Sequence, residues 1–484
     1  MAINIFLKIN ISRQSSYSGY SNMFNFMQAW HHQSPASCYF SPTNTFENNG
    51  DKFVQYWPGL VDSKGNCYYT SFPPFSFQLC YLLWWLTNFS NLEIVFFAIN
   101  ILFHFATALL CMLSVIKIIA ALRYKSSKLA ALFTFSAVLF TPITFWFFTD
   151  YFFIENVALL LTAFFIYAIS RYYANSSIYN FGMVLFTIIT LCYTEAIGYF
   201  AALTFFVFIY TEQKKWLSTK AIALVFSCGF ILLLTFFQYG LIEGWQPMLH
   251  NFAVRFMGRS GFFGAAKTEN GVGIFSVDLY IYAWHLLKLG MLALLLLFAA
   301  LLISFFVRIK SNEISNELTK KKFWWFVSLP ILMHCFIFIN ANALHDQLIV
   351  KLVLPLSILC GVLIGIFSQQ KKSRWAIYGF AGLLIGIMYY PVMFAESMGD
   401  EGVEQAAKKF IHQSSSNKSM IVICNKNQFY QAPSLFYHSN RNYFLLLDTL
   451  LINDAKQRLI TDSSIIFKVD ANWQVESSST IANH

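Results

Sequence analysis

The pattern of apolar and polar positions divides the chain into three parts. Residues 1–75 contain no run of the roughly 20 apolar residues that a membrane-spanning helix requires. A series of such runs follows, separated by short polar connections, and near residue 396 the pattern changes again to short mixed segments. We therefore expect an N-terminal loop segment (1–90), a multispan transmembrane domain (91–395) and a small C-terminal domain (396–484).

The middle part predicts about ten transmembrane helices, so the expected fold class is an all-α polytopic membrane protein. The expected spans are 91–119, 126–147, 151–170, 179–195, 196–211, 218–242, 279–307, 323–341, 347–368 and 375–395. The pair around Glu195 is also compatible with one long bent helix. Before the spans, residues 76–89 are long enough only for a re-entrant or interfacial helix, and Trp84 and Trp85 suit the level of the lipid headgroups.

The C-terminal part combines two kinds of pattern. EGVEQAAKKFIHQ is typical of an amphipathic helix, whereas SMIVICN and SSIIFKVD are typical of strands. These segments predict a small α/β domain. With fewer than 90 residues its own core is marginal, so we expect it to lean on the membrane part.

Lysine and arginine fall on alternate short connections, which places those connections on one side of the membrane. They are Arg123, Lys125, Lys128, Arg171, Lys214, Lys215, Lys220, Arg308, Lys310, Lys320 to Lys322, Lys371, Lys372 and Arg374. We expect that side to be cytoplasmic, in an inner (plasma) membrane. Both terminal segments and the long loop 243–278 are then extracytoplasmic. An outside N-terminus implies either that the 91–119 helix inserts with reversed polarity or, as we favour, that a first transmembrane helix is missing from the chain.

Composition supports the membrane assignment and narrows the partners. Hydrophobic residues make up 57% of the 484 residues and charged ones 12%, with a mean hydropathy of +0.54, which excludes an ordinary soluble enzyme. The net charge of +10 resides mostly in the short connections, so we expect no nucleic-acid binding. The nine cysteines are scattered singly and form no CxxC pair, so we expect no structural zinc site. Most of them are expected to be buried. Only Cys38 and Cys67 share a loop, where a disulfide is an open alternative.

Ionisable residues near membrane depth are the candidates for chemistry, because burying them is costly. Asp150 and Glu155 stand five residues apart at the outer end of an expected helical hairpin. Such paired carboxylates suit a divalent cation or a substrate hydroxyl, and we find no other sign of a cofactor. Alternatively, Asp150 caps the next helix and Glu155 has a buried partner. Glu195, at the outer end of another hairpin, is a weaker candidate.

Two further groups lie on the expected outer side. Arg255 and Arg259 are four residues apart in the loop 243–278, ahead of the flexible GRSGFFG, and their guanidinium groups suit a phosphate or pyrophosphate. Ordinary binding of lipid headgroups is the alternative. His345 and Asp346 precede the span that carries Lys351, and the histidine suits a phosphate or a sugar hydroxyl.

The stretch 51–75, DKFVQYWPGLVDSKGNCYYTSFPPF, is the polar and aromatic loop that we expect to form one wall of a site at the membrane surface. Asp51 and Glu47 are possible bases, whereas Asp62 lies in the turn signature DSKGN. The chain contains no Walker A loop, no GxSxG and no HExxH, which argues against ATP-driven transport and triad hydrolysis.

The run YYTSFPPFSFQLCYLL resembles the Y-x-x-x-P-P stretch that closes the first external loop of glycosyltransferases with the C-type membrane fold. That superfamily includes the protein O-mannosyltransferases and the aminoarabinose transferases of lipid A. Three further features occur in the same order along the chain and on the same side of the membrane as in that superfamily. They are Asp150 with Glu155, Arg255 with Arg259, and His345 with Asp346. The resemblance implies that a sugar on a polyprenyl phosphate is transferred, with inversion, to a glycan, lipid or protein acceptor activated by an acidic base of the first loop.

The resemblance also implies roles for individual residues. Arg255, Arg259 and His345 would stabilise the leaving phosphate, Tyr69 of the motif would contact substrate, and Asp150 would hold the acceptor or a metal. The chain departs from the family where the key acid is expected, because ISRQSSYSGYSNMFNF contains no Asp or Glu. Either Asp51 or Glu47 replaces that acid, or the protein is catalytically silent. A transporter, flippase or polysaccharide polymerase, and a binding protein with the same fold, are the alternative functions.

Overall fold

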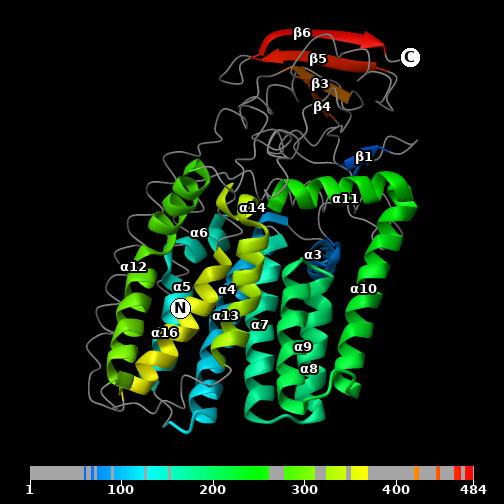
Figure 1. The fold of residues 1–484 in the computed structure, drawn as a ribbon. Coiled ribbons are helices and arrows are strands. Elements are labelled where there is room, and N and C mark those ends of the chain that lie inside the picture. Colours follow the sequence, from blue (N-terminus) through cyan, green and yellow to red (C-terminus); the bar gives the residue numbers. More distant parts are fainter. Residues whose placement is uncertain are drawn as a thin grey trace.

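The computed structural model describes most of the membrane part and short pieces on either side of it. The described residues are 59–61, 67–69, 73–88, 92–124, 128–150, 154–260, 277–310, 323–344, 350–368, 419–423, 443–446, 463–469 and 475–482. Within these ranges the apolar stretches form helices, and the short segments of the N- and C-terminal parts form strands (Figure 1).

The membrane part is built of helices, most of which stand side by side in one bundle (Figure 1). They are α3 (Phe75–Leu86), α4 (Leu92–Ala121), α5 (Lys128–Phe140), α6 (Pro142–Asp150), α7 (Ile154–Ala174), α8 (Ile178–Cys192), α9 (Ile197–Gln213), α10 (Thr219–Glu243), α11 (Trp245–Ser260), α12 (Val277–Lys310), α13 (Phe323–Ile337), α14 (Ile339–Leu344), the 3₁₀ turn η4 (Val350–Leu352) and α16 (Val353–Ser368). Five of those described, α4, α7, α10, α12 and α16, are long and apolar enough to cross a membrane. The protein is therefore a multi-pass membrane protein, while the count of ten spans stays a prediction.

The structure divides the expected span 126–147, whereas the pair around Glu195 follows the two expected ranges. The single span expected at 126–147 is two helices, α5 and α6, because the chain turns at Thr141 and Pro142 begins the next helix. Proline lacks the amide hydrogen that a helix interior needs and is tolerated in the first turn. The pair around Glu195 is two helices and not one bent helix, since α8 and α9 are separated by the turn 193–196.

Small residues let the central helices approach closely. A Cβ atom at Gly361 of α16 would collide with Thr134 of α5, and one at Gly365 would collide with Ile119 of α4. Close backbone approach of this kind is the usual way in which membrane helices gain packing energy, since lipid supplies no hydrophobic driving force between them. Accordingly α16 is almost wholly buried at the centre of the bundle.

The described cysteines fit the expectation of buried apolar residues. Cys80, Cys111, Cys192, Cys228 and Cys360 are buried, Cys335 is partly buried, and all six are free. The short helix α3 lies where an interfacial or re-entrant helix was expected, and it turns Trp84 into the core while Trp85 is 55% exposed. The pairing of Cys38 with Cys67 involves side chains outside the described part.

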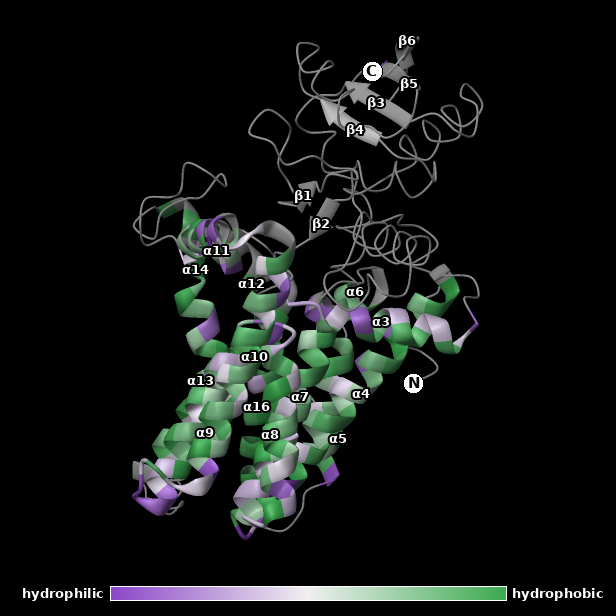
Figure 2. Cartoon of the chain, turned by 90° about the vertical axis from the view of Figure 1, so that its right-hand side faces the viewer, coloured by the Kyte–Doolittle hydropathy of each residue, from purple (hydrophilic) through white to green (hydrophobic). Residues whose placement is uncertain are grey.

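The two ends of the bundle differ. At one end α11 lies across the helix ends, and the β1–β2 hairpin and the C-terminal sheet lie beyond it (Figure 1). We refer to this as the outer end. At the opposite, inner end the chain makes the α7–α8 and α9–α10 connections, where hydrophilic residues gather (Figure 2). Arg171 in the last turn of α7, Lys214 after α9 and Lys220 in the first turn of α10 lie at this end, as the alternation of basic loops requires. Which end faces the cytoplasm stays a prediction.

Strands occur only in short pieces of the described chain. β1 (Gly59–Val61) and β2 (Cys67–Tyr69) pair antiparallel. In the C-terminal segment β3 (Ser419–Ile423), β4 (Tyr443–Leu446), β5 (Ser463–Val469) and β6 (Val475–Ala482) form a sheet in the order β4-β3-β5-β6. β3 is parallel to β4 and β5, and β6 is antiparallel to β5. The expected strands are therefore present, while the expected helix at 401–413 and the span 375–395 lie outside the described residues.

Candidate active site at the outer end

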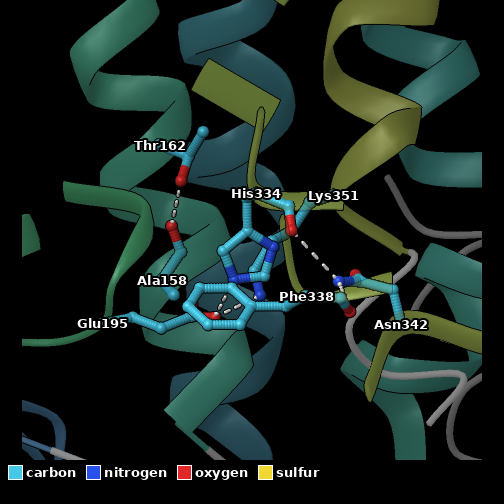
Figure 3. Close-up of polar contacts among 7 residues, drawn as sticks. All are labelled: Ala158, Thr162, Glu195, His334, Phe338, Asn342 and Lys351. Atoms are coloured by element: carbon cyan, nitrogen blue, oxygen red, sulfur yellow. Dashed lines mark hydrogen bonds and ion pairs between the residues drawn. The ribbon is translucent and has the colours of Figure 1, made fainter. Parts of the chain in front are cut away.

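Three ionisable side chains meet inside the bundle near its outer end. Glu195 Oε1 lies 2.6 Å from Lys351 Nζ and 3.0 Å from His334 Nε2, so one carboxylate oxygen binds both partners (Figure 3). The residues come from the α8–α9 turn, η4 and α13, respectively. Their exposed fractions are 2% for Glu195, 0% for Lys351 and 3% for His334. A fully buried lysine is rare in proteins unless a partner neutralises it, as Glu195 does here.

The local backbone explains why Glu195 points inward. The Glu195 amide donates to Leu191 O (2.8 Å) and the Gly198 amide donates to Glu195 O (3.1 Å), which closes a tight turn between two antiparallel helices. Residue 198 must be glycine in this turn, because a Cβ atom there would collide with the backbone of Cys192. The turn directs Glu195 towards α13 and η4.

The charges in the cluster fix the ionisation of Glu195, which lies in the turn and outside the helices. Burial alone would raise the pKa of this carboxyl group. The positive charge of Lys351 and the hydrogen bond from His334 outweigh that effect and lower the pKa to about 2. Glu195 is therefore a carboxylate at any physiological pH, and its Oε1 atom can only accept hydrogen bonds.

A second carboxyl group and an arginine complete the group. Glu155 lies in the first turn of α7 with 1% exposure, and it interacts electrostatically with Lys351, Glu195 and Arg259. Arg259 lies in the last turn of α11, is half-buried, and also acts on His334. We call Glu155, Glu195, Arg259, His334 and Lys351 the outer cluster. It combines two acidic, two basic and one imidazole side chain.

The outer cluster has buried polar atoms without a hydrogen-bond partner among the described residues. They are both carboxyl oxygens of Glu155, Oε2 of Glu195 and Nδ1 of His334. Oδ1 of the adjacent Asn342 belongs with them, although the Asn342 amide nitrogen donates to the carbonyl oxygens of Phe338 (2.8 Å) and His334 (3.4 Å) (Figure 3). Buried polar atoms in proteins almost always have partners, so a group of such atoms makes the outer cluster the candidate site for a polar ligand.

One hydrogen bond ties the first loop to this cluster. The Phe75 amide, directly after Pro73 and Pro74, donates to Tyr193 O at 3.2 Å, two residues from Glu195. The end of the Y-x-x-x-P-P stretch therefore lies against the turn that carries the buried carboxylate. The sequence predicts that residues 51–75 form one wall of the site, and this contact is made by the last residue of that stretch.

The structure brings together some of the predicted site residues. Glu155 and Arg259 lie close enough to the weaker candidate Glu195 and its partners to interact with them electrostatically. For Asp150 in α6, Arg255 in α11 and Tyr69 in β2 the structure describes the backbone but not the side chain. Asp51, His345 and Asp346 lie outside the described residues.

Sequence reasoning missed His334 and passed over Lys351 as part of a span. The signal was available, because each is an ionisable residue inside an otherwise apolar run, FWWFVSLPILMHCFI and VKLVLPLSILCGVLI. What the sequence could not show is that both meet Glu195, which lies 139 and 156 residues earlier in the chain. In the described part of the chain no three His, Cys, Asp or Glu side chains come close enough together to hold a metal ion.

Comparison with solved structures identifies the fold. The protein superposes on ArnT from Cupriavidus metallidurans in the apo state with a TM-score of 0.58, covering 100% of this chain and 97% of ArnT, at 10% sequence identity. The ArnT complex with undecaprenyl phosphate gives a TM-score of 0.55 over the same shares. AglB, the archaeal oligosaccharyltransferase from Archaeoglobus fulgidus in complex with an inhibitory peptide and a dolichol-phosphate, gives 0.55 at 10% identity, over 96% of this chain and 69% of AglB.

No protein-family model and no curated protein sequence matches the chain. The structural likeness nevertheless extends over the whole chain, and it agrees with the resemblance carried by the Y-x-x-x-P-P stretch. The protein has the C-type fold of the membrane glycosyltransferases.

Proposed function

We propose that the protein is a membrane glycosyltransferase that moves a sugar from a polyprenyl-phosphate donor to a glycan, lipid or protein acceptor on the extracytoplasmic side of the membrane, in assembly of the cell envelope. The observation that carries the proposal is the outer cluster, a buried group of opposite charges at the outer end of this fold. The likeness to ArnT supports it, because ArnT binds undecaprenyl phosphate in the same fold.

The basic residues of the outer cluster suit the leaving group of such a reaction. When the bond between the sugar and the phosphate breaks, negative charge grows on the phosphate, and fixed cations in a water-poor site lower the barrier. Arg259 offers a planar fork of donors for phosphate oxygens. Lys351 belongs to the same cluster. Its ammonium group has three N–H donors, and the contact with Glu195 uses one of them.

Glu155 suits the sugar or the acceptor. Both its oxygens are buried without a partner in the described structure, and a carboxyl group can form hydrogen bonds with two hydroxyl groups at once. Asp150 ends α6 four residues before α7 begins, so its backbone lies at the same end of the bundle as Glu155. We therefore retain Asp150 as the second acidic residue, and the pair as the place where a divalent cation would bind if the reaction uses one.

The other predicted residues keep their proposed roles. Tyr69 would contact substrate, and Arg255 would assist Arg259, since the two are four apart in α11 and share one face of that helix. His345 and Asp346 follow α14 directly and precede η4, so they belong to the connection between His334 and Lys351. Asp51, in the first loop, is the acidic residue that the sequence predicts as a base.

The test is sugar transfer in membranes that contain the protein. Radiolabelled sugars on polyprenyl phosphate are supplied as donors, and label that enters lipid, glycan or protein is measured. Arg259→Ala is compared with Arg171→Ala, an arginine at the inner end that packs on Tyr167 and Tyr179. We expect a loss of about 100-fold or more for Arg259→Ala and wild-type transfer for Arg171→Ala.

Two results would contradict the proposal. Equal loss in both arginine variants, with equal protein levels, would show that the effect is not specific to the outer end. Absence of transfer by the well-folded wild-type protein with every donor would favour a transporter or a binding protein with this fold.

A further inference from the structure

His334 is the imidazole side chain of the outer cluster. Its Nε2 atom lies 3.0 Å from Glu195 Oε1, and its Nδ1 atom is buried and has no hydrogen-bond partner among the described residues. Because Glu195 is ionised and can only accept, Nε2 must carry the hydrogen. In the neutral ring Nδ1 is then the nitrogen with the free lone pair.

We propose that Nδ1 of His334 is the general base that takes the proton from the acceptor hydroxyl, with Glu195 as the residue that fixes the ring. This inference rests on the proposed function. A carboxylate behind an imidazole is the arrangement by which an enzyme holds one tautomer and stabilises the imidazolium that forms. It gives the protein a base in place of the acid that is absent from ISRQSSYSGYSNMFNF.

The surroundings of the ring favour this role. Phe200 and Phe338 contact the imidazole edge to face, with ring centroids 6.2 and 5.3 Å from its own, and so restrict its rotation. Lys351 binds the same carboxylate oxygen, and its positive charge disfavours a second cation beside it. The resting imidazole is therefore neutral, which is the form that can accept a proton.

The reaction balances without a co-reactant. The acceptor hydroxyl loses its proton to Nδ1 while its oxygen forms a bond to the anomeric carbon of the sugar. The bond from that carbon to the phosphate oxygen breaks, and the lipid phosphate leaves with the electron pair. The imidazolium, held by Glu195, afterwards returns the proton to water or to the departing phosphate.

The experiment compares His334→Gln with His104→Gln. A glutamine at 334 can still donate a hydrogen bond to Glu195 but cannot accept a proton. His104 is an equally buried histidine, 0% exposed, whose Nε2 lies 3.0 Å from the carbonyl oxygen of Val138 and whose ring stacks on Phe148. His104→Gln therefore measures the effect of removing a buried imidazole ring without removing the proposed base. Sugar transfer, its pH dependence and binding of undecaprenyl phosphate are measured on the same preparations.

We expect His334→Gln to lose about 10²- to 10⁴-fold in kcat while it still binds undecaprenyl phosphate. In the wild type kcat/KM should rise with pH as Nδ1 loses its proton, and this limb should be absent from the residual activity of His334→Gln. The charged groups around the ring, Glu195, Lys351, Arg259 and Glu155, are the same in both proteins. Added imidazole should restore part of the activity of His334→Ala, whereas His104→Gln should keep the wild-type kcat and pH profile.

Three results would overturn the inference. Transfer by His334→Gln within about threefold of wild type, with the same pH limb, would show that another group is the base. Loss of undecaprenyl phosphate binding together with activity would show a structural role. A wild-type protein without turnover would refute the proposed function and this step with it, a result distinct from a loss confined to the variant.

Discussion

Lys351 at the outer end and Lys220 at the inner end show two ways of placing a lysine in a membrane protein. Lys220 is half-buried, donates to the hydroxyl of Tyr172 (2.9 Å), and lies 4.9 Å from the centre of that ring. Lys351 is fully buried and binds a buried carboxylate at 2.6 Å. An ammonium group with access to the interface and to aromatic rings is a common anchor, whereas a buried ion pair costs desolvation that its attraction only partly repays.

The two lysines differ in what their burial costs in free energy. Hydrophobic residues of the same volume would satisfy the packing at the outer end at least as well as an ion pair. Charged residues buried at membrane depth usually mark function. We therefore distinguish residues that anchor the bundle in the membrane, such as Lys220, from residues that prepare it for a ligand, such as Lys351. Variants at the two ends test this distinction.

The largest difference is expected between Lys351→Met and Lys220→Met. Lys351→Met leaves Glu195 buried without its ammonium partner and should lower the free energy of unfolding by about 3–5 kcal/mol. Lys220→Met should cost about 1 kcal/mol or less. Thermal unfolding of the detergent-solubilised proteins measures both. The double variant Lys351→Met with Glu195→Leu should recover much of the loss, and failure to recover it would contradict the ion-pair explanation.

A smaller difference is expected between two glycines. Gly198→Ala forces a Cβ atom into the backbone of Cys192 and should shift the turn that carries Glu195, at a cost of about 1–3 kcal/mol. Gly182→Ala, in α8 toward the inner end, meets nothing within 4 Å and should stabilise the helix by up to about 1 kcal/mol. The same unfolding measurement compares them. Equal stability of the two variants would show that the turn has room to adjust.

The acid stability of the wild type should depend on Glu195. Its pKa in the folded protein, about 2, lies below the ordinary value of 4.5, so its contribution to stability is complete above about pH 4.5 and is lost as the pH falls toward 2. The stability advantage of wild type over Glu195→Gln should therefore shrink across this window. Unfolding temperatures of both proteins from neutral pH to about pH 3 provide the test. An advantage that is independent of pH would rule out this assignment of the charge.

The sequence predicts the membrane part well because apolar stretches directly determine membrane helices. The expected ranges around α4, α7, α10 and α12 agree with the observed helices to within a few residues. The division at Thr141 and Pro142 was missed, since the apolar pattern continues through it. The side-chain partners were harder to predict, because Glu195, His334 and Lys351 are brought together by packing of α9, α13 and α16 and by no local pattern.

The most direct test of the outer cluster as the place of chemistry uses two glutamates. Glu155→Gln changes a buried carboxylate of the outer cluster, and Glu212→Gln changes an exposed one near the inner end of α9. The measurement is the rate of sugar transfer from a polyprenyl-phosphate donor at equal amounts of folded protein. We expect a loss of about 100-fold or more for Glu155→Gln, because this carboxyl group positions the sugar or the acceptor, and an unchanged rate for Glu212→Gln. Wild-type transfer by Glu155→Gln would contradict this expectation.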